Sequence, residues 1–238
     1  MTIMSKKALP YIVSVPFVIC NLRSMTDTLI RAALFDLDGV VFDTESQYSK
    51  FWGEQCRMYH PDKPGLENEI KGQTLVMIFD KYFSGLKDEQ PKIIAALDEF
   101  ERGMGFEYID GFLDFIGSLK CKGIKTAVVT SSNMMKMRSV YAAHEEFRSL
   151  FDAILTSEDF ERSKPDPDCY YKGAAALGVS PDECVVFEDS FNGLKSGRAA
   201  GMTIVGLSTT NKADEIKPYC DFVIPDFMHI PQTLKSKF

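Results

Sequence analysis

Short runs of consecutive apolar residues recur along the chain and alternate with stretches whose apolar residues return every three or four positions. An unbroken apolar run is typical of a strand covered on both faces, and the three-to-four spacing is typical of an amphipathic helix. This alternation predicts an α/β fold with a parallel, doubly wound sheet. The predicted strands span residues 30–37, 124–130, 153–156, 184–188, 203–207 and 221–224.

Two of the predicted helices carry clear end signals. "GFLDFIGSLKCKG" ends at Gly123, and glycine commonly stops a helix because it tolerates the left-handed conformation. "DPDCYYKGAAALG" has Asp166 as the candidate N-cap, Pro167 at the first helical position and Gly178 at its end. Both stretches lie between predicted strands, where a parallel sheet needs crossover helices.

Residues 46–108 interrupt the alternation of strands and helices. The stretches "SQYSKFWGEQCRMY", "GLENEIKGQTLVMIFDKYF" and "DEQPKIIAALDEFERGMG" each have helical spacing, and no strand pattern appears among them. A crossover of this length without its own structure is uncommon in a compact domain. We therefore expect an inserted helical cap at 46–108, and a core built from 25–45 and 109–238.

The first two dozen residues differ in character from the rest. The stretch "KKALPYIVSVPFVICNL" resembles a weak signal peptide, but Pro10 and Pro16 interrupt its apolar run and no clear cleavage site follows. Met25 stands just before the first predicted strand. We expect residues 1–24 to be a disordered tail or an over-extension of the true start, with an export or anchor segment as the alternative.

Composition limits the kinds of molecule that the protein is expected to bind. A formal net charge of −7 argues against a nucleic-acid-binding surface and suits a protein that handles small molecules. The six cysteines are scattered and form no CxxC pair, so neither a zinc site nor a disulfide framework is indicated. We expect a cytoplasmic protein, a monomer or weak dimer, that engages neither nucleic acid nor a membrane.

Acidic residues gather where the predicted strands end. Asp36 and Asp38 follow the first strand in "LFDLDGVVFDTE", while Glu188 ends the fourth and Asp189 follows it. Carboxylates at close range repel one another and raise each other's pKa unless a cation neutralises them. The carboxyl ends of parallel strands share one edge, and hard oxygen ligands suit Mg²⁺. The sequence therefore predicts a magnesium site at this edge.

Hydroxyl groups and a lysine are predicted at the same edge. Thr130, Ser131 and Ser132 follow the second strand, and Lys164 precedes a helix in "SKPDPD". Such groups, together with loop amides, can hold a phosphate. A carboxylate beside the phosphate and metal can attack it to form an aspartyl-phosphate, and a second carboxylate can protonate the leaving oxygen and then activate water.

Four motifs strengthen this reading. "DLDGVVFDTE", "VVTSSN", "SKPDPD" and "VFEDSFNG" occur in this order, and together they resemble the motifs of the haloacid dehalogenase-like (HAD) superfamily, in its phosphatase and phosphomutase branch. The resemblance runs from about residue 30 to the end of the chain. It implies a Rossmann-like core, and the inserted helices match the small helical cap of one subclass.

The resemblance implies particular roles for the four acids. Asp36 would be the nucleophile and a Mg²⁺ ligand. Asp38 would be the general acid and base, and would bind Mg²⁺ through its backbone carbonyl. Asp189 would ligate Mg²⁺, with Glu188 beside it as a direct or water-mediated ligand. The second acid of the pair, Asp38, separates this chain from the dehalogenase branch.

The resemblance also implies how the phosphate is held. Thr130 and Ser131 would bind the transferring phosphoryl group, and Lys164 would balance charge at the nucleophile and the phosphate. The neighbouring Ser132 and Asn133 have an alternative reading, in which they only cap the next helix.

The branch that this chain resembles contains β-phosphoglucomutase and sugar phosphatases, so two reactions are open. Tyr48 stands where the mutases usually carry a hinge histidine, and Leu75 or Val76 stands where their cap carries an arginine. Both departures favour hydrolysis of a small phosphorylated metabolite, expected to be a sugar phosphate. A mutase is the runner-up, and a non-catalytic metabolite-binding protein is the third candidate.

Overall fold

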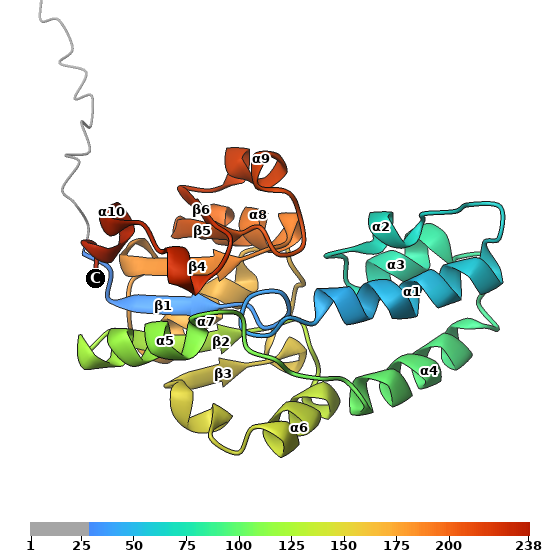
Figure 1. The fold of residues 1–238 in the computed structure, drawn as a ribbon, viewed down its shortest axis with the longest axis horizontal. Coiled ribbons are helices and arrows are strands. Elements are labelled where there is room, and N and C mark those ends of the chain that lie inside the picture. The colour runs from blue at the N-terminus through green and yellow to red at the C-terminus, as the bar shows by residue number, and fades with distance from the viewer. Residues whose placement is uncertain (1–28) are drawn as a thin grey trace, which may run out of the picture.

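The computed structural model describes residues 29–238, so the predicted tail at 1–24 lies outside the described residues. Within them, a six-stranded, entirely parallel sheet has the order β3-β2-β1-β4-β5-β6 (Figure 1). The predicted α/β doubly wound sheet is confirmed. The strands are β1 (Ala32–Phe35), β2 (Lys125–Val129), β3 (Ala153–Leu155), β4 (Cys184–Glu188), β5 (Thr203–Leu207) and β6 (Phe222–Ile224).

The first strand lies at the centre of the sheet. Phe35 pairs with Val128 of β2 on one side and with Phe187 of β4 on the other. From β1 the chain builds β2 and β3 outward on one side, and then crosses back to place β4 on the opposite side of β1. This reversal is a topological switch point, where open parallel sheets commonly bind ligands.

Helices cover both faces of the sheet, which is why its strands are apolar on both sides. One face packs against α5 (Phe112–Cys121) around Phe35, Phe112 and Phe187. The other face packs against α7 (Asp168–Leu177) and α8 (Phe191–Ala199), with Leu34 and Tyr170 in its core. All of these core side chains are buried.

Helix ends follow the predicted signals with one correction. Gly123, just after α5, and Gly178, the C-cap of α7, have φ angles of 73° and 63°, as glycine stops require. The helix α7 begins at Asp168 with Pro167 as its N-cap, so the expected Asp166 cap is wrong. Asp166 lies one residue before the N-cap, and its side chain accepts a hydrogen bond from the Asp168 amide.

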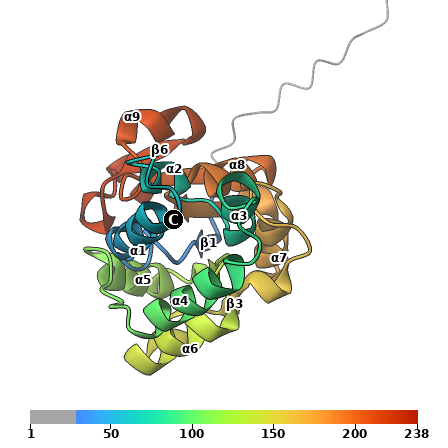
Figure 2. The ribbon, with the colours of Figure 1, turned by 90° about the vertical axis from the view of Figure 1, so that its right-hand side faces the viewer.

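The inserted segment contains four of the described helices, and Figures 1 and 2 show them beyond the carboxyl ends of the strands. They pack around an apolar cluster of their own that includes Trp52, Phe79, Phe83 and Leu97. A separate small core explains how so long an insertion stays ordered. These helices are α1 (Glu45–Tyr59), α2 (Glu67–Ile70), α3 (Leu75–Tyr82) and α4 (Gln90–Arg102).

The stretch 65–83, expected to be one helix, is broken between α2 and α3. Gly72 lies in the break with a φ of 67°, and a Cβ atom there would lie 3.0 Å from the Cβ of Ser190 in the core. The break therefore allows the inserted segment to approach the sheet edge closely. The break could not be predicted from the sequence because helical spacing continues on both sides of Gly72.

The remaining described elements lie around the sheet. The helix α6 follows β2, and none of the helices within residues 29–238 has both the length and the apolar character needed to cross a membrane. Short helices that the sequence did not predict complete the chain. The expected helix α6 spans Met134–Ala143, and the short helices are α9 (Ala213–Ile216), α10 (Gln232–Lys235) and the 3-10 turns Phe147–Leu150, Ser157–Asp159, Pro181–Glu183, Lys217–Tyr219 and Phe227–His229.

Candidate active site

The turn after β1 presents two acids on one short loop. Asp36 and Asp38 flank Leu37, whose side chain is fully buried and anchors the loop in the core. Gly39 follows with a φ of 70°, and a Cβ atom there would lie 2.1 Å from Oδ2 of Asp189. Glycine is thus needed both for the turn and for the close approach of Asp189.

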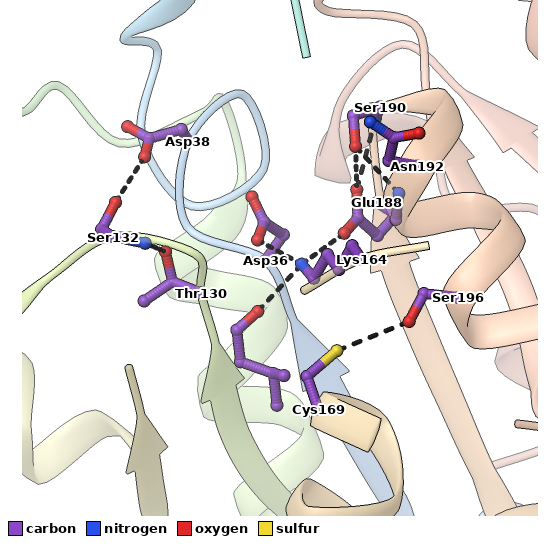
Figure 3. Close-up of polar contacts among 12 residues, drawn as sticks. Asp36, Asp38, Thr130, Ser132, Lys164, Cys169, Glu188, Ser190, Asn192 and Ser196 are labelled. Carbon is purple, nitrogen blue, oxygen red and sulfur yellow. Dashed lines mark hydrogen bonds and ion pairs between the residues drawn. The ribbon is translucent and has the colours of Figure 1, made fainter. Parts of the chain in front are cut away.

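Lys164 joins the first of these acids to the end of β4. Its Nζ atom lies 2.6 Å from Oδ1 of Asp36 and 2.6 Å from Oε1 of Glu188, and it donates a third hydrogen bond to the Val129 carbonyl (Figure 3). Burial by itself lowers the pKa of Lys164, but the charges of Asp36 and Glu188 outweigh it and raise that pKa. The ammonium therefore stays charged beside the predicted nucleophile.

Glu188 is fully buried and both of its oxygens are held. Oε1 also accepts a hydrogen bond of 2.8 Å from the Tyr170 hydroxyl, and Oε2 accepts from the backbone amides of Asp189 and Ser190. Donors on every side fix the orientation of this carboxylate. Glu188 thus helps to order the acidic corner that it forms with Asp36 and Asp189, as well as adding charge to it.

Asp36, Glu188 and Asp189 form a group that can hold a metal ion, because each offers a carboxylate oxygen and these oxygens all lie within 4.8 Å of one another. Burial raises the pKa of Asp36 to about 7 against the opposing charge of Lys164, and burial together with Glu188 raises the pKa of Asp189. Three carboxylates face one ammonium, so a divalent cation would balance the corner. All-oxygen donors fit Mg²⁺.

The second acid of the loop has different partners. Asp38 accepts hydrogen bonds from the hydroxyls of Thr44 at 2.6 Å and Ser132 at 3.0 Å, and Lys136 donates to both of its carboxylate oxygens. Figure 3 shows its side chain pointing toward Ser132, away from Asp36. Although burial opposes the change, Lys136 and these hydroxyls lower the pKa of Asp38.

The predicted phosphate-binding residues follow β2. Thr130 is buried, and its Oγ1 accepts a hydrogen bond of 3.0 Å from the Ser132 amide, whereas Ser131 is exposed at the cleft. Asn133 is the N-cap of α6, accepting from the Lys136 amide, as its alternative reading expected. Ser132 does not cap this helix, and its hydroxyl donates to Asp38 instead.

These residues meet in a cleft of about 440 Å³ between the sheet edge and the inserted helices. From the core, Asp36, Asp38, Thr130, Ser131 and Lys164 line it. Glu188 and Asp189 are buried beside Asp36. The structure therefore brings all seven predicted site residues to one place.

The wall of the cleft contributed by the inserted segment is acidic. Among the described residues, this wall carries the ammonium of Lys71 and four carboxyl groups, those of Glu45, Glu67, Asp98 and Glu101. Burial raises the pKa of Glu45 to about 7, with the Asp38 charge adding to the rise, and burial also raises the pKa of Glu101. A second anion would be disfavoured on this side.

Sequence comparison identifies the family to which the chain belongs. The profile of the haloacid dehalogenase-like hydrolase family matches residues 33–207 of the chain. The chain belongs to the haloacid dehalogenase-like hydrolase family, and the resemblance seen in its four motifs is confirmed.

Named relatives include phosphatases and a phosphomutase. A Saccharomyces cerevisiae protein named a probable pseudouridine-5'-phosphatase is 32% identical over 193 residues, covering 74% of this chain and 81% of the relative. Hexitol phosphatase A of Escherichia coli is 29% identical over 185 residues, covering 75% and 83%. The crystal structure of β-phosphoglucomutase from Clostridium difficile has a TM-score of 0.67 at 19% identity, covers 88% of this chain and 97% of that one, and shares the fold.

Proposed function

We propose that this chain is a Mg²⁺-dependent phosphomonoester hydrolase that acts on a small sugar or polyol phosphate through an aspartyl-phosphate on Asp36. The observation that carries the proposal is the pairing of Asp36 with Lys164 at 2.6 Å, beside the buried Glu188 and Asp189 and next to Asp38 on the same loop. One acid is thereby prepared for attack and another for proton transfer.

In the first step, a carboxylate oxygen of Asp36 attacks phosphorus. The bond to Lys164 uses Oδ1, and the other oxygen points away from that lysine (Figure 3). An oxygen–phosphorus bond forms to Asp36, and the bond from phosphorus to the leaving oxygen breaks. Asp38 in its protonated form gives that oxygen a proton, while Thr130, Ser131 and Lys164 bind the phosphoryl oxygens.

In the second step, Asp38 takes a proton from a water molecule that attacks phosphorus. The bond to Asp36 breaks, inorganic phosphate leaves, the Asp36 carboxylate is restored and Asp38 is protonated again. Asp36, Asp189 and the Asp38 carbonyl, with Glu188 as a direct or water-mediated ligand, would hold Mg²⁺. When bound, Mg²⁺ supplies positive charge that neutralises the acids and the phosphoryl oxygens.

The acidic wall of the cleft favours a neutral leaving group. Sugar and polyol hydroxyls can hydrogen-bond to Glu45, Asp98 and Glu101, whereas a carboxylate or second phosphate would face their charges. Leu75 and Val76, one of which stands where the related mutases carry a cap arginine, both line the cleft. A mutase must hold a bisphosphate intermediate, so this wall supports hydrolysis over the runner-up. Relatives named as pseudouridine-5' and hexitol phosphatases point to the same substrate class.

The inserted segment and the core would have separate tasks. Residues 46–108 would act as a cap that closes over the substrate, hinging near 43–45 and 108–110, while 25–45 and 109–238 form the catalytic core. We propose that the enzyme works in the cytoplasm as a monomer or weak dimer, without a nucleic-acid or membrane partner.

The test is a substrate screen with Mg²⁺ that measures released phosphate. The panel contains sugar and polyol monophosphates, and matched compounds in which the leaving group carries a carboxylate or a second phosphate. We expect the highest kcat/KM values among the neutral leaving groups. If none of the compounds released phosphate, the proposed hydrolase activity would be contradicted. A preference for anionic leaving groups would contradict the proposed substrate class.

A further inference from the structure

Lys136 is a buried cation that the proposed reaction leaves without a role. Its side chain is 2% exposed, and it lies on the buried face of α6 with Met137 and Val140. Taking an ammonium group out of water is unfavourable unless acceptors surround it. A lysine at this position on a buried helix face therefore indicates a specific set of partners.

Those partners form a line from the active site into the inserted helices. The Nζ atom of Lys136 donates to both carboxylate oxygens of Asp38 and, at 2.6 Å, to the Tyr48 hydroxyl oxygen. The Tyr48 hydroxyl in turn donates a hydrogen bond of 2.7 Å to Glu101. Asp38 and Lys136 belong to the core, whereas Tyr48 lies on α1 and Glu101 on α4.

We propose that Lys136 is a positioning residue, which holds the Asp38 carboxyl group in place and ties it to the cap through Tyr48 and Glu101. The inference rests on the proposed function, because Asp38 is the group that exchanges the proton there. A carboxyl group keeps acceptor capacity whether or not it is protonated, so Lys136 can orient Asp38 in both steps.

The helices themselves support a link of this kind. The inserted helix α4 packs beside the core helix α6, so the position of the cap decides whether Tyr48, with Glu101 behind it, reaches Lys136 (Figure 1). Withdrawal of α1 and α4 would remove the Tyr48 hydroxyl from the ammonium and leave it on Asp38 alone. Closure over the substrate therefore completes the set of contacts that orients Asp38.

The first test compares two substrates in the Mg²⁺-loaded enzyme. An alkyl phosphate needs a proton on its leaving oxygen, whereas p-nitrophenyl phosphate releases a stable phenolate without one. We expect Lys136→Met to lower kcat/KM for a sugar phosphate by about 10- to 100-fold and for p-nitrophenyl phosphate by less than about threefold. The matched control is Lys125→Met. Lys125 lies at the start of β2 and its ammonium binds the Leu177 carbonyl, so we expect this variant to change neither value.

A double-mutant cycle with Asp38→Asn separates positioning from a structural role. If Lys136 acts through Asp38, Lys136→Met adds less than about threefold to the loss on the sugar phosphate when Asp38 is already replaced. An equal loss on both substrates, or a full additional loss in the Asp38→Asn background, would overturn the proposal.

Tyr48→Phe provides the second variant if Lys136→Met does not fold. It removes the hydroxyl that joins Lys136 to Glu101 and keeps the ring. We therefore expect the kcat/KM for the sugar phosphate, divided by that for p-nitrophenyl phosphate, to fall by about 3- to 10-fold. An unchanged ratio in folded Tyr48→Phe protein would overturn the link to the cap. Failure of the proposed function is distinct, because the wild type would then hydrolyse neither substrate.

Discussion

The side-chain amide of Asn192, in the first turn of α8, donates a hydrogen bond of 3.3 Å to the carbonyl oxygen of Gly72 in the inserted segment. This contact lies across the cleft from the bond between Lys136 and Tyr48, since Asn192 follows β4 and Lys136 follows β2. The inserted helices are therefore joined to the core on two sides of the candidate active site.

We expect Asn192→Ala to weaken closure more than chemistry. Loss of one neutral hydrogen bond amounts to about 1 kcal/mol, which corresponds to a rise in KM of about fivefold with a smaller change in kcat. Steady-state kinetics on the best substrate of the screen measures both. Asn68→Ala is the control, because the Asn68 amide bonds to the Gly65 carbonyl within the inserted segment. An unchanged KM in Asn192→Ala would show that this contact does not assist binding.

Asp36→Asn should abolish turnover. An amide is a very poor nucleophile, so we expect less than about a thousandth of the wild-type rate, while Asp38→Asn should trap phosphate on Asp36. Phosphate release and mass spectrometry of the intact protein measure the two outcomes. Asp114→Asn, at an exposed position of α5, should keep full activity. A rate for Asp36→Asn above that limit would contradict the covalent mechanism.

Much of the fold follows from local pattern, and the exceptions follow from contacts between distant residues. The strands β4 and β5 match their predicted bounds because burial on both faces leaves an unbroken apolar run. The break at Gly72 was missed because helical spacing continues on both sides of it, and the residue it approaches, Ser190, is more than a hundred positions later in the chain.

The candidate site shows the same division between local sequence pattern and contacts between distant residues. Residues on the motifs, such as Asp36 and Lys164, could be placed because parallel strands end at one edge. Lys136 carried a signal that was overlooked, a lysine four residues before Val140 on a buried helix face. Its partner Tyr48 lies 88 positions away, so only the packing of α1 and α4 against the core brings them together.

Removal of metal should silence the enzyme. We expect EDTA to stop phosphate release and Mg²⁺ to restore it better than Ca²⁺, which prefers more ligands and longer bonds and would misplace the Asp36 carboxylate. Activity after chelation and titration with each cation measures this. Full activity in metal-free buffer would remove the reason for gathering Asp36, Glu188 and Asp189 in one corner.

The metal-free protein should lose stability as the pH rises. Burial raises the pKa of Asp36 from 3.8 to about 7, so the folded state holds a proton that the unfolded state has already released between these values. This contribution is present at low pH and is lost as the pH rises through about 7, and Asp189, whose pKa burial also raises, acts in the same direction.

Mg²⁺ replaces those protons, so its stabilising effect should grow with pH. We expect the rise in melting temperature on adding Mg²⁺ to be larger at about pH 8 than at about pH 5. Thermal unfolding with EDTA and with Mg²⁺ at each pH gives the four values required. Asp36→Asn removes one of the titrating groups and should reduce the difference, whereas a shift independent of pH would contradict this reading of the acidic corner.

Hydrolysis and phosphomutation can be separated by the charge of the cleft wall. In the wild type, Leu75 lines the same cleft as Glu45, Asp98 and Glu101, and we expect such a wall to repel the bisphosphate that a mutase must retain. Incubation with β-glucose 1-phosphate, Mg²⁺ and a catalytic amount of the bisphosphate should release phosphate faster than it forms glucose 6-phosphate. Leu75→Arg adds a cation to this wall and should strengthen inhibition by the bisphosphate by about tenfold, with Leu75→Met as the neutral control. Rapid formation of glucose 6-phosphate by the wild type, ahead of free phosphate, would replace the hydrolase with the mutase.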